Sequence, residues 1–105
     1  MALHTIDQAK RAVRAAGGHW FDPETLRYFG SRISSTVYSV PGGCLFVSSE
    51  HTGFARLGRA YSVRYVSDAG QVETVGEFLQ YQTRNAAHAA ARREQARLRS
   101  LVTCA

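Results

Sequence analysis

The chain has 105 residues, with 13 lysine and arginine residues against 8 acidic residues and a formal net charge of +5. That length allows one domain with one core, and a content of 45% hydrophobic and 20% charged residues is typical of a globular protein. These figures exclude a large multidomain enzyme and a disulfide-rich toxin. No apolar run approaches the ~20 residues that a membrane-spanning helix needs.

Two helices are predicted in the first 30 residues. Thr5 and Gln8 have the spacing of a capping box, which predicts a helix over about residues 6–16. Gly17 and Gly18 would end that helix, because glycine adopts the left-handed conformation without steric cost. Asp22 as N-cap and Pro23 at the first helical position predict a second, short helix over 23–29.

β-forming residues dominate from residue 31 to residue 75. Pro41-Gly42 fits a type II turn between an extended run that ends at Val40 and a short apolar strand over 44–47. Residues 48–59 are interpreted as a looser connection. Tyr61, Val63 and Tyr65 alternate with Ser62 and Arg64, which is the pattern of a half-buried strand. Residues 72–75 are predicted to form a fourth strand after a turn. The short connections favour an antiparallel meander.

The remainder of the chain, residues 76–102, is predicted to be one long helix, because it contains no proline and no glycine after Gly76. Thr74 and Glu77 would cap it. Its apolar residues are mostly alanines, so the last turns would be weakly docked, frayed or docked on something else. The fold class is therefore α+β, and we expect the helices to cover one face of the sheet. The predicted core contains Trp20, Phe21, Phe29, Phe46, Tyr61, Val63, Tyr65 and Phe78.

The two cysteines, Cys44 and Cys104, are interpreted as reduced thiols, Cys44 in a strand and Cys104 in the tail. A disulfide between them is the less favoured alternative. They form no zinc motif, and the four dispersed histidines lack metal-ligand spacing, so no metal and no cofactor is expected. The first residues contain no signal peptide, which favours a cytoplasmic location.

The positive charge is concentrated on the predicted terminal helices. Residues 1–20 carry a net charge of +2, residues 21–83 a net charge of −1, and residues 84–105 a net charge of +4. Arginine binds carboxylates and phosphates in bidentate fashion, so the basic surface suits an acidic protein surface or a nucleic-acid backbone. A solvated helix face is an equally weighted alternative. The candidate binding residues are Arg84, Arg92, Arg93, Arg97 and Arg99, with Arg56 and Arg59 as a second group.

No catalytic constellation is convincing. Ser48, Ser49, Glu50 and His51 lie too close in sequence for a triad and have no nucleophile elbow, so they are better interpreted as polar residues at a strand end. Cys44 with His51 or His19 is a weaker dyad hypothesis. A deep pocket converging on Cys44, His51 and Glu50 would revive an enzyme reading.

Two further segments are each open to a binding interpretation. Residues 53–58 begin and end with glycine but lack the Lys-Ser/Thr end of a phosphate loop. Tyr61 and Tyr65 could stack bases on an open sheet, although a core face explains their alternation better.

Several sequence runs resemble a family of small uncharacterised phage and prophage proteins. They are GHWFDPET at residues 18–25, RYF at 27–29, SRI at 31–33, FVSSE at 46–50, RAYSVR at 59–64 and TVGEF at 74–78. The resemblance covers about residues 5–90 and brings no established activity. It implies a phage-encoded accessory protein in a bacterial cytoplasm, a class that often acts by stoichiometric binding and includes anti-CRISPR and other anti-defence inhibitors.

The favoured hypothesis is therefore a non-enzymatic phage protein that binds a host protein or nucleoprotein complex, with a CRISPR effector as one candidate target. The alternative is a sequence-tolerant DNA- or RNA-binding phage protein. Neither hypothesis involves a membrane. Self-association through the C-terminal helix is a further option that the sequence leaves open.

Overall fold

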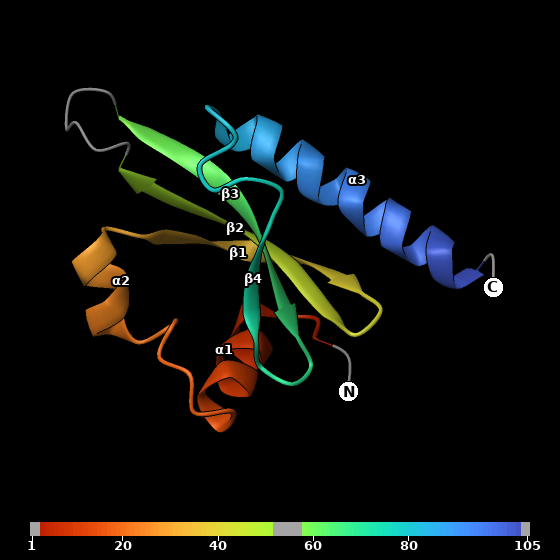
Figure 1. The fold of residues 1–105 in the computed structure, drawn as a ribbon, viewed down its shortest axis with the longest axis horizontal. Coiled ribbons are helices and arrows are strands. Elements are labelled where there is room, and N and C mark those ends of the chain that lie inside the picture. The colour runs from red at the N-terminus through yellow and green to blue at the C-terminus, as the bar shows by residue number, and fades with distance from the viewer. Residues whose placement is uncertain (1–2, 52–57, 104–105) are drawn as a thin grey trace.

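A computed structural model describes residues 3–51 and 58–103. Its four strands form one antiparallel sheet in the order β1-β2-β3-β4, with two helices before it and one after it (Figure 1). The elements are α1 (Ile6–Ala15), α2 (Pro23–Phe29), β1 (Arg32–Val40), β2 (Gly43–His51), β3 (Arg59–Ser67), β4 (Val72–Val75) and α3 (Arg84–Thr103). This arrangement confirms the predicted α+β class and the antiparallel meander.

The predicted signals at the two N-terminal helices are present. The Thr5 side chain accepts a hydrogen bond from the Gln8 backbone, and the Gln8 side chain accepts one from the Thr5 backbone, which completes the capping box. Gly17 follows α1 with a φ of 82°. α2 begins at Pro23, but Asp22 makes no capping hydrogen bond, and its carboxylate lies 2.8 Å from His19 instead.

The sheet is covered on both faces, so the expectation that the helices share one face is wrong. Figure 1 shows α1 and α3 on opposite sides of the sheet. Side chains alternate along a strand, so Cys44 and Phe46 of β2 pack with α1, whereas Leu45 and Val47 pack with Ala87 of α3. Each face therefore has its own apolar cluster.

The last helix begins at Arg84 rather than at residue 76. Gly76 has a φ of 74° and Leu79 a φ of 57°, and two such positions interrupt an α-helix. Tyr81 instead extends the sheet by exchanging two backbone hydrogen bonds with Tyr61, of 2.7 and 3.0 Å. The Thr83 side chain then caps α3 by accepting a hydrogen bond from the Ala86 N–H. Thr74, predicted as the cap, lies within β4.

The aromatic core is smaller than predicted. Phe21, Phe46 and Val63 are fully buried, while Trp20, Tyr61 and Tyr65 are half-buried against the two clusters. Phe78 is wrong as a core residue, because it lies in the connection before α3 and its ring is 57% exposed. The side chain of Phe29 lies outside the described part of the structure.

The connection predicted over 48–59 is also shorter than expected. Ser48 to His51 complete β2, Arg59 begins β3, and the two strands pair from Gly43–Ser67 to His51–Arg59. Ser48, Ser49 and Glu50 are buried rather than at a loop end. Residues 52–57 lie outside the described residues, and with them Arg56 and all of the glycine-bounded segment except Gly58.

Packing of α3 on the sheet is strongest in its first half, as its composition predicts. Ala87, Ala90 and Ala91 are buried, and Leu98 packs on the cluster as the last such residue among the described side chains of the helix. Leu101 is 60% exposed. Among residues 3–51 and 58–103, no helix is long and apolar enough to cross a membrane.

Candidate functional site

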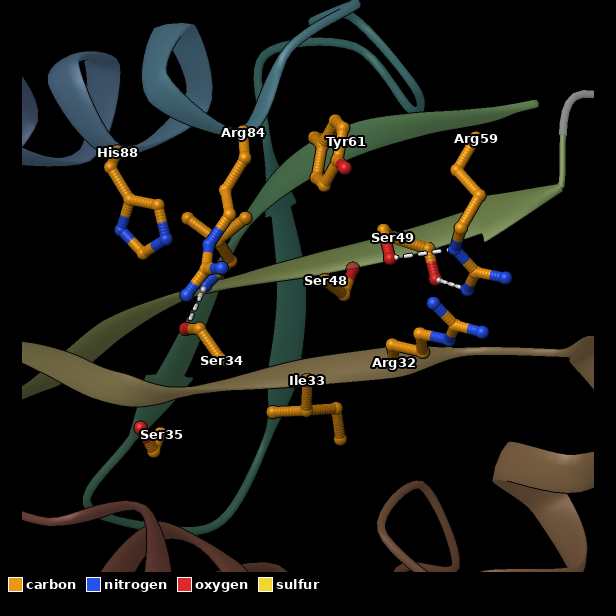
Figure 2. Close-up of a pocket in the computed structure, with 11 residues that line it drawn as sticks. Arg32, Ile33, Ser34, Ser35, Ser48, Ser49, Arg59, Tyr61, Arg84 and His88 are labelled. Atoms are coloured by element: carbon orange, nitrogen blue, oxygen red, sulfur yellow. Dashed lines mark hydrogen bonds between the residues drawn. The ribbon is translucent and has the colours of Figure 1, made fainter.

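The candidate site is a cleft between the β1–β2 half of the sheet and the start of α3, with a volume of about 360 Å³ (Figure 2). We call it the cationic cleft, because it contains three arginines and no described acidic residue. It is lined by Arg32, Ile33, Ser34, Ser35, Val47, Ser48, Ser49, Arg59, Tyr61, Arg84 and His88.

The three arginines come from three different elements. Arg32 begins β1, Arg59 begins β3 and Arg84 begins α3. Arg32 is opposite Ser49 of β2 in the strand register, and Ser49 in turn contacts Arg59. Figure 2 shows the head groups of Arg32 and Arg59 pointing toward one another, with Arg84 reaching from α3 toward Ser34. The fold therefore gathers three positive charges from residues that are far apart in the sequence.

Arg59 is held in place by neutral groups. Its Nε donates to the Ser49 hydroxyl at 3.0 Å, and its Nη2 donates to the Ser49 carbonyl at 2.6 Å and to the Gly30 carbonyl. These contacts fix the direction in which the guanidinium points. By contrast, Arg32 and Arg84 make no side-chain hydrogen bond or ion pair with any residue that the structure describes.

A bulge in β1 shapes the floor of the cleft. Between the pairs Ile33–Ser48 and Val37–Phe46, three residues of β1 stand opposite Val47 alone. The Ser34 hydroxyl replaces the missing ladder partner, because it accepts a hydrogen bond from the Val47 N–H at 3.3 Å. Bulges often re-aim side chains next to functional sites. Here the bulge places the Ser34 hydroxyl beneath Arg84.

His88 adds a neutral polar group to the wall of the cleft. Its Nδ1 lies 2.7 Å from the Tyr38 hydroxyl, and its Nε2 is buried with no partner in the described part of the chain. Burial lowers the pKa of His88, and the charges of Arg84 and Arg92 lower it further. When Nδ1 accepts a hydrogen bond from the Tyr38 hydroxyl, the neutral ring carries its own hydrogen on Nε2. Nε2 is then a donor without an acceptor in the described part of the chain.

This combination of groups suits an anion. Three guanidinium groups supply fixed positive charge and forked donors, and the Ser49 hydroxyl and His88 supply single donors. Like charges that line one cleft repel one another, and an anion between them would relieve that repulsion. Phosphate and carboxylate groups both match this donor set, and phosphate matches it better because it presents more acceptor oxygens.

The structure separates the arginines predicted from the sequence into two groups. Arg59 and Arg84 line the cationic cleft. The other predicted residues of α3 are exposed, and Arg97 forms an ion pair with Glu94 one turn away. Arg92 belongs to the exposed group, but its charge helps to lower the pKa of His88 in the cleft. Arg56 lies outside the described residues.

The catalytic alternatives are not assembled in the described part of the molecule. Cys44 is buried under α1, and burial followed by the charge of Asp68 raises its pKa to about 11. Glu50 is on the same sheet face but pairs with Arg64 and lines a different pocket, which does not include Cys44. The side chain of His51 lies outside the described part. No group of His, Cys, Asp and Glu among residues 3–51 and 58–103 could hold a metal ion.

Sequence reasoning missed Arg32, Ser34 and His88. Arg32 stands in the sequence beside β-forming residues and carries no motif, and its importance comes from the register that places it opposite Ser49. His88 does lie four residues after Arg84, one helical turn away, so the helix periodicity could have grouped these two residues.

Comparisons with known proteins place the chain in a family without assigning an activity. Comparisons with curated proteins and with solved structures found no significant match. Residues 5–92 match a family model that covers every element from α1 to the first half of α3, including all eleven residues that line the cleft. The chain therefore belongs to the family of unknown function DUF7447.

Proposed function

We propose that this protein acts by binding rather than by catalysis, and that the cationic cleft contacts a phosphate-bearing group of a host nucleoprotein complex. The observation that carries the proposal is the convergence of Arg32, Arg59 and Arg84 in a cleft whose described lining has no carboxylate. Arginines that converge in one cleft are a binding feature, because bringing like charges together costs folding energy that a bound anion offsets.

The biological setting of the proposal comes from the resemblance to small phage proteins. In that setting the protein works in the bacterial cytoplasm, binds stoichiometrically and blocks its target, and an anti-defence role of the anti-CRISPR type is one form that this would take. An effector complex that itself binds nucleic acid exposes phosphate groups that the cleft suits.

A second candidate is sequence-tolerant binding to free DNA or RNA. It is favoured by the row of arginines on α3, since Arg84, Arg92 and Arg99 fall within about 80° of one helix face at 100° per residue. A row along a helix can follow a nucleic-acid backbone, whereas a single cleft suits one anionic group.

The experiment uses two double variants with the same change in net charge. Arg32→Gln with Arg84→Gln alters the cleft and leaves Arg59 in its structural contacts. Arg11→Gln with Arg27→Gln alters two exposed arginines elsewhere and is the control. Binding of labelled single- and double-stranded DNA and RNA is measured by fluorescence anisotropy over a series of salt concentrations.

The proposals predict different results. Binding to free nucleic acid predicts that log K falls linearly with log salt, and that the cleft variant has a shallower slope than the control by roughly two. Binding to a nucleoprotein complex predicts weak binding to free oligonucleotides. It also predicts stoichiometric co-purification with an intact host nucleoprotein complex, which the cleft variant loses and the control keeps. Equal behaviour of both variants in both assays would contradict the assignment of the cleft.

A further inference from the structure

A second pocket lies on the opposite face of the sheet, between α2, the sheet and the connection before α3. Its volume is about 230 Å³, and its walls are mostly apolar. Trp20, Leu26 and Phe78 form the walls, and Ser31, Glu50 and Arg64 form the polar end. We call it the aromatic pocket. Drug-sized ligands occupy pockets of roughly 300–1,000 Å³, so this pocket has room for a single planar group.

Glu50 brings one acceptor oxygen, unpartnered among the described residues, to the polar end of the aromatic pocket. Its Oε1 lies 3.3 Å from Arg64 Nη2 and accepts a hydrogen bond from the Ser31 hydroxyl, also at 3.3 Å. Its Oε2 is buried and has no partner in the described residues, and the side chain as a whole is only 7% exposed. A buried carboxylate oxygen without a donor costs free energy. A donor on a ligand at this end of the pocket would supply the missing hydrogen bond.

Arg64 determines which donor is suitable. Its guanidinium neutralises Glu50, and it donates to the Ser48 and Thr74 hydroxyls. It lies 5.4 Å from the ring centre of Trp20 and 5.1 Å from that of Phe78. A second cation beside Glu50 would meet the charge of Arg64, and an anion would meet the carboxylate. The site therefore favours a neutral N–H donor.

We infer that the aromatic pocket binds a nucleobase that carries an exocyclic amino group. The amino group donates to Glu50 Oε2, and the planar ring packs against the aromatic side chains. Splayed-out bases are recognised in this way, by stacking on aromatic rings together with hydrogen bonds to their edges. The exposure of Phe78, a large apolar side chain that does not pack into the core, supports a ligand-facing role for it.

This inference shares one assumption with the proposed function, namely that the partner contains nucleic acid. A phosphate-binding cleft and a base-binding pocket both suit such a partner. The two sites use different residues. A free nucleoside can test the pocket without the cleft, because it carries no phosphate.

The experiment uses Trp20, the sole tryptophan of the chain, as a reporter within the pocket. Tryptophan fluorescence and the indole N–H signal in NMR are followed during titration with adenosine, and with adenosine dimethylated on its exocyclic amine. The dimethylated probe keeps the stacking surface but has no donor. We expect saturable binding of adenosine and roughly ten-fold weaker binding of the dimethylated probe.

Variants then locate the binding. Phe78→Ala, at an exposed ring, should weaken adenosine binding roughly five-fold or more. The double variant Arg32→Gln, Arg84→Gln should bind adenosine as the unmodified protein does, even if it fails to bind the phosphate-bearing partner. Glu50→Gln, checked for folding by circular dichroism, should also bind adenosine more weakly. If it does not fold, the comparison of the two probes still tests the role of Oε2. Equal affinity for both probes, no saturation with adenosine, or unchanged binding by Phe78→Ala would overturn the inference.

Discussion

The Tyr38 hydroxyl lies 2.7 Å from Nδ1 of His88, and this contact joins β1 to α3 across fifty positions of the chain. The two rings are tilted at 57° with centres 5.9 Å apart. Tyr38 thereby fixes the orientation of His88 and the direction in which Nε2 faces the cationic cleft.

Removing the Tyr38 hydroxyl should destabilise the protein. Tyr38→Phe leaves His88 Nδ1 without its partner, and a partly buried polar atom left unpaired costs about 1–3 kcal/mol in the free energy of unfolding. Tyr65→Phe is the matched control, because the hydroxyl of Tyr65 donates to the Gly42 carbonyl at an exposed position. Urea denaturation of both variants measures the difference. An equal loss in the two variants would show that the Tyr38–His88 contact has no special weight.

His88 should also make stability depend on pH. Its pKa is lowered in the folded protein, so the unfolded chain binds the proton more tightly. The free energy of unfolding should therefore fall as the pH drops below the unfolded pKa of about 6.5. Below the pKa of His88 in the folded protein, this residue causes no further fall in the free energy of unfolding. His88→Gln should have a flatter profile between about pH 8 and pH 5 in denaturation experiments. If the free energy of unfolding of His88→Gln depended on pH as steeply as that of the unmodified protein, His88 would not be the group responsible.

The turn between β3 and β4 should tolerate no side chain at Gly70. This residue has a φ of 85°, and a Cβ there would lie 2.2 Å from the Ala12 carbonyl oxygen of α1. Gly70→Ala should therefore combine backbone strain with a clash and loosen α1 from the sheet.

Gly17→Ala is the control for backbone strain alone, since Gly17 has a φ of 82° but open space around its Cα. We expect Gly17→Ala to cost about 1–2 kcal/mol and Gly70→Ala clearly more. Thermal unfolding measures both. Equal melting temperatures for the two variants would contradict the close approach of the turn to α1.

The Cys44 thiol should not react with thiol reagents in the folded protein. Burial, with a smaller contribution from Asp68, raises its pKa to about 11, so about one thiol in a thousand is ionised near pH 8. In a Cys104→Ser variant, a thiol-specific reagent should react with no thiol under native conditions and with one in urea. Rapid reaction without denaturant would place Cys44 at the surface.

Local signals predicted local structure well. The capping box at Thr5, the proline start of α2 and the glycines after both helices depend on residues within a few positions of each other, and the structure contains all of them. The alternation at 61–65 likewise identified β3. These features need no information from distant parts of the chain.

Features that depend on distant contacts could not be predicted in this way. Residues 76–83 have a helical composition, but the pairing of Tyr81 with Tyr61 and the Leu79 N–H bond to the Ser62 hydroxyl hold them in an extended connection. Glu50 is a charged residue at an expected strand end, yet Arg64 allows it to be buried. The cationic cleft likewise depends on the register of β1 against β2, which one sequence does not reveal.

Ser49 and Glu50 are neighbours in β2, yet one faces the cationic cleft and the other faces the aromatic pocket. A strand alternates its side chains with a period of two, so a shift of one residue would exchange the two faces. The Glu50 carboxylate would then stand among Arg32, Arg59 and Arg84 and neutralise them. A single-residue insertion before Val47 in β2 would therefore abolish both sites at once while changing none of the residues that form them.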